Sequence, residues 1–444
     1  MSQYRAYPAY KDSGVEWIGL VPEHWEVKRL KHLISQCQNG VWGDDPLEDG
    51  SDTLCIRVAD FDRDNNVVIY NPSTYRQITK EHQDSRLVSK GDILLEKSGG
   101  GAQTLVGANV RYLGEEPAVC SNFVAVIKPS KKAESAWLNY LMASMYALKI
   151  NLRSIKQSTG IQNLDSEQYL DEGVAAPSLD EQATIAAALD RETARIDALI
   201  EKKTRFIELL KEKRQALITH AVTKGLDPNA KMKDSGVEWI GQVPEHWEVK
   251  PICRVTSVND DVLPDSTTDD TPIRYVDISS VGYMEGIKQA SDMCFADAPS
   301  RARRKASSGD VIISTVRTYL KAVAVVTDEY ADCVFSTGFA VLRARHLDRS
   351  FLKWMVLNEL LIQAIEAHSE GLSYPAINAS ALVKLKSVIP PPEEQASIAA
   401  TLDRETARID ALMDKAKQSI TLLKERRAAF ITAAVTGQID LRGK

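Results

Sequence analysis

The stretch KDSGVEWIGLVPEHWEVK at residues 11–28 occurs again, with one substitution, as KDSGVEWIGQVPEHWEVK at residues 233–250, an offset of 222 residues. A second repeat follows, because LDRETARIDAL occurs at residues 189–199 and at residues 402–412, an offset of 213 residues. Self-similarity at a fixed distance is the sequence signature of a repeated structural unit. The chain therefore contains one structural plan twice, in two halves of unequal length.

The segments between the repeated blocks, at about 29–177 and 251–389, diverge in sequence. Faint common marks remain, such as GDIL at residues 91–94 against GDVI at residues 309–312. Near-identity of the blocks can follow from recent duplication alone, so the contrast between blocks and segments carries the inference. Two copies of one frame that hold two different bodies suit a protein that presents two distinct binding surfaces in a fixed geometry.

The composition is that of a folded protein. A chain of 444 residues exceeds the usual size of one domain, and its 44% hydrophobic and 26% charged residues are ordinary for globular proteins. The first ten residues contain no apolar segment, and no later run approaches the roughly 18 apolar residues of a membrane span. The six cysteines are scattered singly, without the close pairs of metal or redox sites. We expect a cytoplasmic protein with reduced thiols, no metal and no membrane contact.

The second repeated block opens a long helix in each half. Ser178 to Glu181 fits a capping box in which Glu181 reaches back to the first turn, and the second copy enters through Pro390–Pro392. Gly225 and Gly437 supply C-terminal stops, so each helix should run for about 40 residues and about 60 Å. The expected apolar stripe consists of Leu189, Ile196, Leu199, Phe206, Leu210 and Leu217 in the first copy and of Leu402, Ile409, Leu412, Leu423 and Phe430 in the second.

Such a stripe requires a partner helix, and its duplicate is the simplest partner. We expect the two helices to form an antiparallel coiled coil, with polar seam positions at Glu192, Lys203, Lys213 and Glu405 that set the register. The alternative is that each helix packs on its own globular domain.

The diverging bodies mix short β-type runs, such as Val67–Tyr70, Asp92–Leu95 and Val323–Val326, with one helix each, near Trp137–Leu148 and Phe351–Ile365. The sequence thus predicts an α+β protein: two α/β globular domains joined by two long antiparallel coiled-coil helices, with an internal pseudo-two-fold repeat. The aromatic residues of the first repeated block are expected to hold domain and helices together rather than to stack on a ligand. The expected divisions are 1–177 with block 11–28, helix 178–224, 225–389 with block 233–250, and helix 390–444.

No catalytic constellation stands out. Asn71 to Tyr75 (NPSTY) departs from the adenine-methyltransferase tetrapeptide by an extra residue and a missing proline, and is interpreted as a turn. Gly99–Gly101 lacks the following Lys-Ser or Lys-Thr of a phosphate-binding P-loop and is interpreted as a flexible loop. The sequence therefore predicts a protein that is not an enzyme.

A net charge of −6 counts against a protein that simply coats DNA, because phosphate binding depends on lysine and arginine. A DNA-binding function would rest on local patches. One candidate comprises Arg301, Arg303, Arg304 and Lys305; another comprises Lys149, Arg153 and Lys156, whose spacing would put them on one helix face. For either run, a solvated surface is the alternative.

The order of the blocks is GVEWIGxVPEHWEVK, a variable body, and DEQ or EEQ at the start of a long LDxxTxxIDxLIxK-type helix. Over nearly the whole chain this order resembles the DNA-specificity subunits of Type I restriction-modification systems. Asp180–Gln182 and Glu393–Gln395 lie where that family's conserved regions begin, and Gly91 and Gly309 lie where its target-recognition domains carry a Gly-Asp turn.

The resemblance implies a DNA-binding subunit without catalytic residues or a cofactor of its own. In that family each target-recognition domain reads one half of a split double-stranded DNA site, and the helices act as the ruler between them. The catalytic work belongs to partner subunits: two methyltransferase subunits that use S-adenosylmethionine on adenine N6, and restriction/translocase subunits for which ATP and Mg are expected. Because the two bodies are dissimilar, we expect an asymmetric bipartite site.

Base-edge contacts are expected from polar loops of the bodies, with basic residues that fix the register on phosphates. The candidates are Lys97, Ser98, Gln103, Lys156 and Gln157 in the first body and Arg301, Arg303, Arg304, Arg317, Tyr319 and Lys321 in the second.

Two other functions remain open at this point. A fused methyltransferase-reader enzyme would require a cofactor pocket and an intact tetrapeptide, and a coiled-coil adaptor without DNA function would leave the two dissimilar bodies without a purpose.

Overall fold

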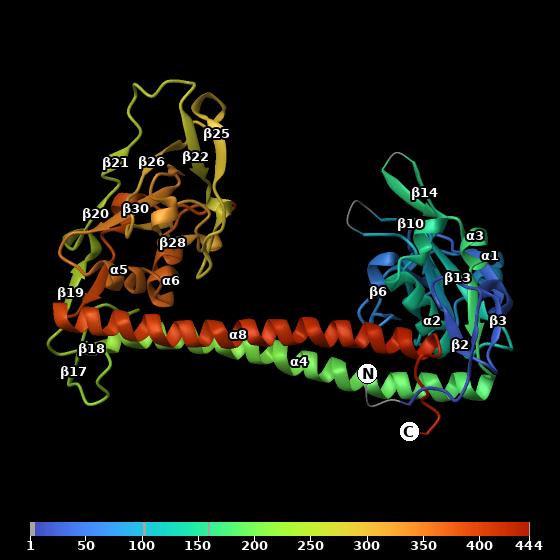
Figure 1. The fold of residues 1–444 in the computed structure, drawn as a ribbon. Helices are drawn as coiled ribbons and strands as arrows, with labels where there is room; N and C mark the ends of the chain where they lie inside the picture. The colour runs from blue at the N-terminus through green and yellow to red at the C-terminus, as the bar shows by residue number, and fades with distance from the viewer. Residues whose placement is uncertain (1–4, 101–103, 159, 444) are drawn as a thin grey trace. The chain divides into compact units, whose positions relative to one another are not determined.

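The computed structural model describes residues 5–100, 104–158 and 160–443. The chain divides into two compact units, one formed by residues 1–203 with 418–444 and the other by residues 204–417. The long helices α4 (Leu179–Lys224) and α8 (Pro392–Val435) each contribute one half to each unit (Figure 1). Each unit has its own α+β core, which agrees with the predicted fold class.

The first unit is built on a six-stranded sheet with the order β4-β13-β9-β11-β7-β6. Its central strands are buried on both faces, as the apolar run Ile93–Leu95 requires. Helix α2 (Ser135–Ala147) packs between this sheet and the long helices, because Trp137 and Leu141 share one core with Ile93 of the sheet and Leu189 of α4. The strands of the sheet are β4 (Ile34–Asn39), β6 (Phe61–Asp62), β7 (Val67–Val68), β9 (Ile93–Glu96), β11 (Asn109–Arg111) and β13 (Val124–Pro129).

Smaller sheets complete the first unit, in the orders β12-β5-β8, β10-β15-β14, β1-β2 and β16-β3. Their strands are β1 (Tyr10–Asp12), β2 (Leu20–Pro22), β3 (Glu26–Arg29), β5 (Thr53–Ile56), β8 (Tyr75–Arg76), β10 (Ser98–Gly99), β12 (Ala118–Cys120), β14 (Ile155–Ser158), β15 (Ile161–Leu164) and β16 (Gly173–Ala176). The short helices are α1 (Lys80–Arg86) and α3 (Ser166–Leu170).

The second unit contains a four-stranded sheet, β20-β30-β27-β28, and a five-stranded sheet, β21-β26-β29-β22-β25, with β23-β24, β17-β18 and β19-β31 as pairs. The strands are β17 (Met232–Asp234), β18 (Gln242–Pro244), β19 (Glu248–Pro251), β20 (Thr256–Val258), β21 (Asp261–Val262), β22 (Pro272–Val276), β23 (Val281–Gly282), β24 (Gly286–Ile287), β25 (Ser291–Cys294), β26 (Ala302–Lys305), β27 (Val311–Ser314), β28 (Val323–Val325), β29 (Val334–Ser336), β30 (Phe339–Ala344) and β31 (Lys386–Ile389).

Helices α5 (Arg349–Val356) and α6 (Glu359–Ala367) occupy the place of the single helix predicted near Phe351–Ile365, and α7 (Ala379–Leu382) follows. The prediction of one helix was wrong because Asn358 starts a new one: its side chain accepts a hydrogen bond of 3.2 Å from the Leu360 amide. An asparagine that caps its own backbone favours a helix start over a helix interior.

The long helices pair antiparallel, as predicted. In the first unit Asp197 of α4 forms an ion pair with Arg427 of α8, with 3.0 Å between Oδ1 and Nε. In the second unit Arg214 of α4 pairs with Asp410 of α8. Early residues of α4 thus meet late residues of α8, and both residues of one pair lie 213 positions from their counterparts in the other, the offset of the second repeat.

The expected apolar stripe is only partly the buried one. Leu189, Ile196 and Leu402 are buried as predicted, but Leu199 and Leu412 are 42% and 45% exposed. Phe206 is also exposed, and the residues that follow Phe206 and Leu412, Ile207 and Met413, are buried instead. Of the expected polar seam residues, Lys213 is exposed, whereas Glu192, Lys203 and Glu405 are half-buried. The start of α4 also packs on the globular domain of the first unit, because its residues belong to the first core. Helix pairing and packing on a domain, which were considered as alternatives, therefore both occur in α4.

The predicted ends of the two long helices are confirmed, except that only one of the two hydrogen bonds of the expected capping box at Ser178–Glu181 forms. Ser178 accepts a hydrogen bond from the Glu181 amide at 3.4 Å, but the Glu181 carboxylate turns away from the helix start. Gly225 and Gly437 follow the two helix ends with φ of +78° and +75°, a conformation that glycine adopts without strain.

The repeated aromatic residues join the bodies to the helices, as predicted. Trp25 and Trp247 are fully buried. The indole Nε1 of Trp25 donates to Glu181 Oε1 at 3.2 Å, and that of Trp247 donates to Glu394 Oε2 at 3.0 Å. The middle glutamate of each DEQ or EEQ motif, Glu181 or Glu394, therefore holds the repeated block against its own long helix.

The glutamine of the same motif contacts the diverging body. Gln182 Oε1 accepts from the Glu134 amide at 2.8 Å, and Gln395 Oε1 accepts from the Asp348 amide at 2.8 Å. Glu134 and Asp348 are the N-caps of α2 and α5. Each long helix is thus fixed at its start to a repeated block and a variable body.

Candidate nucleic-acid interface

In the first unit the sheet β10-β15-β14 brings together candidates that lie far apart in the sequence. Ser98 of β10 and Lys156 of β14 are both paired with Asn163 of β15, and Gln157 lies opposite Gln162. The Ser98 hydroxyl donates to Asn163 Oδ1 at 2.6 Å. Ser98, Lys156 and Gln157 therefore belong to one small sheet, whereas Gln103 lies outside the described residues.

The lysines of this region already have protein partners. Lys97 Nζ donates to Asn39 Oδ1 at 2.7 Å, and Lys156 Nζ to Asp165 Oδ2 at 2.7 Å. The hydrogen bond from Asp165 also raises the pKa of Lys156 above its ordinary value. Since both contacts are at least partly exposed, a phosphate would compete with Asn39 and Asp165 for these ammonium groups.

The expected basic helix face at residues 149–156 does not form. Lys149 has a left-handed backbone with φ of +58°, Arg153 lies in a single 3₁₀ segment (Ile150–Ser154), and Lys156 is on a strand. Arg153 forms an ion pair with Glu16 at 2.9 Å. The prediction was wrong because the left-handed residue interrupts the helix before the three cations could align.

A hollow of about 540 Å³ beside Ser98 was not anticipated from the sequence. Trp42 and Phe123, which are 38% and 47% exposed, line it together with Glu96, whose side chain is 2% exposed. Burial raises the pKa of Glu96, and Arg63 opposes this with an ion pair of 2.8 Å. Aromatic side chains beside polar groups suit contact with nucleobases. The one feature of the sequence that could have indicated this hollow is Phe123, an aromatic residue in an otherwise polar turn.

In the second unit the predicted arginines Arg301, which directly precedes β26, and Arg303 and Arg304, which lie on it, have three different environments. Arg301 donates to the Tyr275 hydroxyl at 3.2 Å and to Asp277 Oδ2 at 2.9 Å. The Arg303 guanidinium lies 4.8 Å from the ring centre of Phe295. Arg304, beyond a register shift in the pairing of β26 with β29, lines a hollow. Such a bulge redirects the side chains that follow it.

The remaining candidates flank the 3₁₀ turn Thr318–Leu320. Arg317 and Lys321 have φ of +52° and +48°, a backbone conformation that costs free energy in non-glycine residues and gathers at functional sites. Tyr319 is 53% exposed. The Arg317 guanidinium lies 5.1 Å from the ring centre of Tyr374 and has no ion-pair partner among the described residues, so it is open to an anion.

Lys321 is directed inward. Its Nζ lies 2.7 Å from Glu359 Oε1 on α6. Burial alone would raise the pKa of Glu359, but hydrogen bonds from Lys321, Tyr283 and Gln215 hold it below its ordinary value. Lys321 is therefore engaged in a contact within the unit and is the weakest of the candidates for DNA contact.

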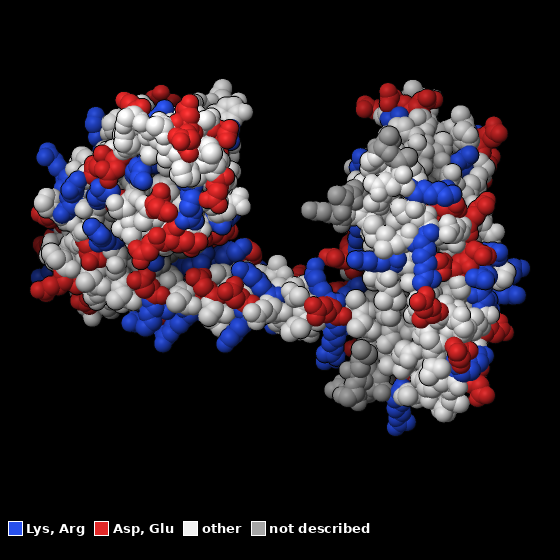
Figure 2. All heavy atoms as spheres, turned by 45° about the horizontal axis from the view of Figure 1, so that its top comes forward, with Lys and Arg blue, Asp and Glu red and all other residues white. Residues whose placement is uncertain are grey.

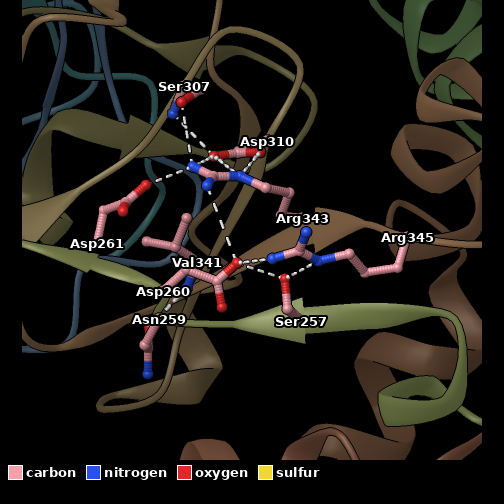
Figure 3. Close-up of polar contacts among 9 residues, drawn as sticks. All are labelled: Ser257, Asn259, Asp260, Asp261, Ser307, Asp310, Val341, Arg343 and Arg345. Atoms are coloured by element: carbon pink, nitrogen blue, oxygen red, sulfur yellow. Dashed lines mark hydrogen bonds and ion pairs between the residues drawn. The ribbon is translucent and has the colours of Figure 1, made fainter.

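A network around Arg343 fixes the strand next to β26 (Figure 3). The Arg343 guanidinium lies 2.8 Å from Asp310 Oδ2 and 2.8 Å from Asp261 Oδ2. Arg345 donates to Asp260 Oδ2 at 2.7 Å, and Ser257 and Arg345 together lower the pKa of Asp260. Since Asp261 lies opposite Lys305 in the pairing of β21 with β26, the network holds the basic strand in place.

The two Gly-Asp turns form as expected. Gly91 and Gly309 have φ of +95° and +86°, where glycine is favoured. The following aspartates accept from the backbone, Asp92 from Ser89 at 2.9 Å and Asp310 from Ser307 at 2.8 Å.

Charges are mixed over both units. Acidic and basic side chains are interspersed on the face of each unit that Figure 2 shows. No cluster of three or more His, Cys, Asp and Glu side chains suited to a metal ion occurs in the described part of the chain. Within the same ranges, no helix has the length and apolar character to cross a membrane.

Comparison with known proteins finds similarity to a single kind of protein. The model of the Type I restriction modification DNA specificity domain matches residues 22–209, which begin in the first repeated block and end within α4. The chain is also 23% identical over 435 residues to the Type I restriction enzyme MjaVIII specificity subunit of Methanocaldococcus jannaschii, with 95% of this chain and 94% of the relative covered. Over nearly its whole length the chain is similar to the specificity subunits of Type I restriction-modification systems.

Solved structures agree in fold. The HsdS subunit from Thermoanaerobacter tengcongensis matches with a TM-score of 0.54 and 19% identity over 94% of this chain and 98% of its own. A chain from a study of complex assembly and conformational transition of the type I R-M system matches with a TM-score of 0.69 and 18% identity, with 94% and 98% covered. This specificity subunit determines the DNA sequence on which the restriction-modification complex acts, and it is a non-catalytic subunit of that complex.

Proposed function

We propose that the bodies at 29–177 and 251–389 are target-recognition domains that each read one half of a bipartite, asymmetric site in double-stranded DNA. Helices α4 and α8 set the spacer between the half-sites. The observation that carries this proposal is the repeat of the frame without a repeat of the bodies: the ion pairs Asp197–Arg427 and Arg214–Asp410 are related by the repeat offset, whereas Trp42 and Phe123 in one body have no counterpart in sequence in the other. Pseudo-two-fold related readers suit two half-sites on one duplex.

The candidate contacts differ in role. In the first domain Ser98, Gln157 and Gln103 are proposed as base-edge readers, with Lys97 and Lys156 on phosphates. In the second, Arg301, Arg303, Arg304, Arg317, Tyr319 and Lys321 are proposed for the same tasks, although Lys321 is already engaged by Glu359. Polar side chains read base edges, whereas cations on phosphates fix the register.

The subunit is proposed to recruit two methyltransferase subunits through the outer faces of its long helices. Leu199 and Leu412, which are equivalent under the 213-residue offset, are 42% and 45% exposed. Leu209 and Leu422 are a second such pair, 46% and 64% exposed. Equivalent apolar positions in both units suit two copies of one partner.

The chemistry is proposed to lie in partner subunits. The methyltransferase subunits would use S-adenosylmethionine, and restriction/translocase subunits would use ATP and Mg, while this subunit would hold no cofactor. The assembled complex would act in the cytoplasm, without membrane contact.

Exchange of one body tests the assignment. The complex with its methyltransferase partner should methylate adenines at a single split site, and replacement of residues 29–177 by the body of a related subunit should change one half-site and leave the other intact. Simultaneous change of both half-sites would show that the domains are not independent readers.

The isolated chain provides the second arm. Incubated with DNA and S-adenosylmethionine, it should transfer no methyl group, and addition of the methyltransferase partner should restore site-selective transfer. Methylation by the chain alone would favour a fused methyltransferase-reader, and absence of selective DNA binding by the complex would favour an adaptor without DNA function.

A further inference from the structure

Arg304 on β26 is a half-buried arginine without a counter-ion. Its guanidinium has no ion-pair or hydrogen-bond partner among the described residues, and its Nε is buried. Burial lowers the pKa of Arg304 below its ordinary value. The nearby Arg301 and Arg343, in contrast, are paired with Asp277 and Asp310. A cation that is partly removed from water and not paired costs folding free energy, so its retention calls for an external partner.

The Arg304 side chain lines a hollow of about 440 Å³, which we call the Arg304 hollow. Its other polar walls are Asn259, Thr315 and Thr337, and the exposed Glu370 lies at its rim. Val316 of the same wall leads directly into Arg317, the second cation without an acidic partner. The Asn259 amide and the Thr337 hydroxyl, beside the guanidinium, are groups that can donate hydrogen bonds to an oxyanion.

The walls of the hollow are held in position by the protein. Arg304 lies opposite Val262 and Phe335 in the strand pairings on its two sides. Asn259, in a left-handed conformation with φ of +56°, accepts from the Val341 amide at 3.0 Å and is held beside the Arg343 network (Figure 3). The Thr315 hydroxyl donates to the Gly338 carbonyl at 3.0 Å. The site is therefore formed before any ligand arrives.

We propose that the Arg304 hollow binds one phosphate of the DNA backbone, with Arg304 as its counter-ion and Arg317 at its rim. This inference rests on the proposed function of the second body. Arginine forms paired hydrogen bonds with phosphate oxygens, and a phosphate contact fixes the register of a reading domain without carrying sequence information. The Arg304 hollow thereby positions the polar loops around Tyr319 on the bases.

The first experiment replaces Arg304 by methionine, which keeps the apolar stem and removes the charge. In complex with the methyltransferase partner, Arg304→Met should lower the affinity for the specific duplex and reduce the slope of log affinity against log salt by about 0.9, the value for one phosphate. The methylated sequence should stay the same. The free chain should unfold at the same temperature or a higher one, because an unpaired charge has been removed.

Neutral methylphosphonate substitutions, made one phosphate at a time, locate the contact. At one position, the methylphosphonate should lower the affinity of the wild-type complex by about the same factor as Arg304→Met lowers it on the native duplex. At that same position, the methylphosphonate should not lower the affinity of the Arg304→Met complex any further. A matched variant, Lys305→Met, should respond to that position as wild type does. Equal loss at every position in both proteins would overturn the proposal.

The substitution Glu370→Gln should change the affinity for DNA in the opposite direction to Arg304→Met. Removal of this carboxylate from the rim should strengthen binding to the native duplex and have no such effect on a duplex that carries the methylphosphonate at the identified position. If the wild-type complex shows no site-selective methylation, the proposed function fails. If it is selective but Arg304→Met keeps both affinity and salt slope, only this inference fails, and a lowered unfolding temperature would then assign Arg304 a structural role.

Discussion

Asp197 and Arg427, which are 230 residues apart, form an ion pair across the two long helices, with Arg427 only 12% exposed and 3.0 Å between Nε and Oδ1. The pair recurs in the other unit as Asp410 and Arg214, where Arg214 is 14% exposed. A half-buried polar pair inside an apolar seam fixes the register of helix pairing, because every shifted register would leave the arginine without its carboxylate.

A double-mutant cycle on this pair should show a coupling free energy of about 1 to 3 kcal/mol. The variants Asp197→Asn, Arg427→Gln and the double substitution are compared by urea unfolding of the full chain. Each single variant already loses the whole charge-assisted contact. The double variant should therefore be destabilised by less than the sum of the two single variants. The equivalent cycle on Asp410 and Arg214 is the matched control and should give coupling of the same sign; additive effects in both would show that the pairs do not specify register.

The two repeated tryptophans should contribute differently to the free energy of unfolding. Trp25→Phe and Trp247→Phe remove the same atoms from fully buried side chains, but the acceptor of Trp25, Glu181, is 7% exposed, whereas Glu394 is 40% exposed. A buried carboxylate that loses a donor is destabilised by about 2 kcal/mol, and an exposed one by less, because water replaces the donor. Urea unfolding of both variants checks the order, and an equal loss would contradict it.

The sequence was sufficient to predict the long helices but not their buried face. Leu199 is followed by Ile200, Phe206 by Ile207, Leu217 by Ile218, and Leu412 by Met413. Because neighbouring positions are apolar, the pattern fits two stripes about 100° apart on the helix, and only the packed structure selects Ile207, Ile218 and Met413. The offset of 213 residues, in contrast, predicted pairing of the copies without any choice of stripe.

The contacts of the candidate DNA-binding residues within the protein could not be predicted from the sequence. Lys321 and Arg301 are candidates for DNA contact, yet their carboxylate partners, Glu359 and Asp277, lie 38 and 24 residues away and are brought close only by the fold. Arg304 looked identical to its neighbours in sequence. Its lack of a partner is a property of the packed unit, and no local pattern could have revealed it.

Five of the six cysteines should fall into two classes of reactivity toward maleimide. Burial raises the pKa of Cys55 and of Cys333 to about 11, and raises that of Cys120 as well. Since the thiolate is the reactive form, these three thiols should resist maleimide labelling of the native protein at pH 7 and label only after denaturation. Cys253 and Cys294 are exposed and should label at once. Mass spectrometry of the labelled peptides checks this, and the variant Cys253→Ser, Cys294→Ser should lose the rapid phase.

We propose that α4 and α8 set the distance between the two half-sites, and the burial of their residues decides where an insertion can be placed. An insertion near Ala221 would disrupt the second core, because Ala221 and Val222 are 2% exposed. Four residues are therefore inserted after Lys203 in α4 and four after Lys417 in α8, where the two units divide. Each insertion adds about one turn and roughly 6 Å, against about 3.4 Å per base pair.

The spacing between the half-sites is then measured by mapping adenine methylation by this variant together with its methyltransferase partner. A control variant carries the same four residues after Asp269, in an exposed loop of the second body, and should keep the wild-type spacing. The helix variant should methylate the same two half-sites, separated by a gap that is one to two base pairs longer. Normal methylation with an unchanged gap would contradict it.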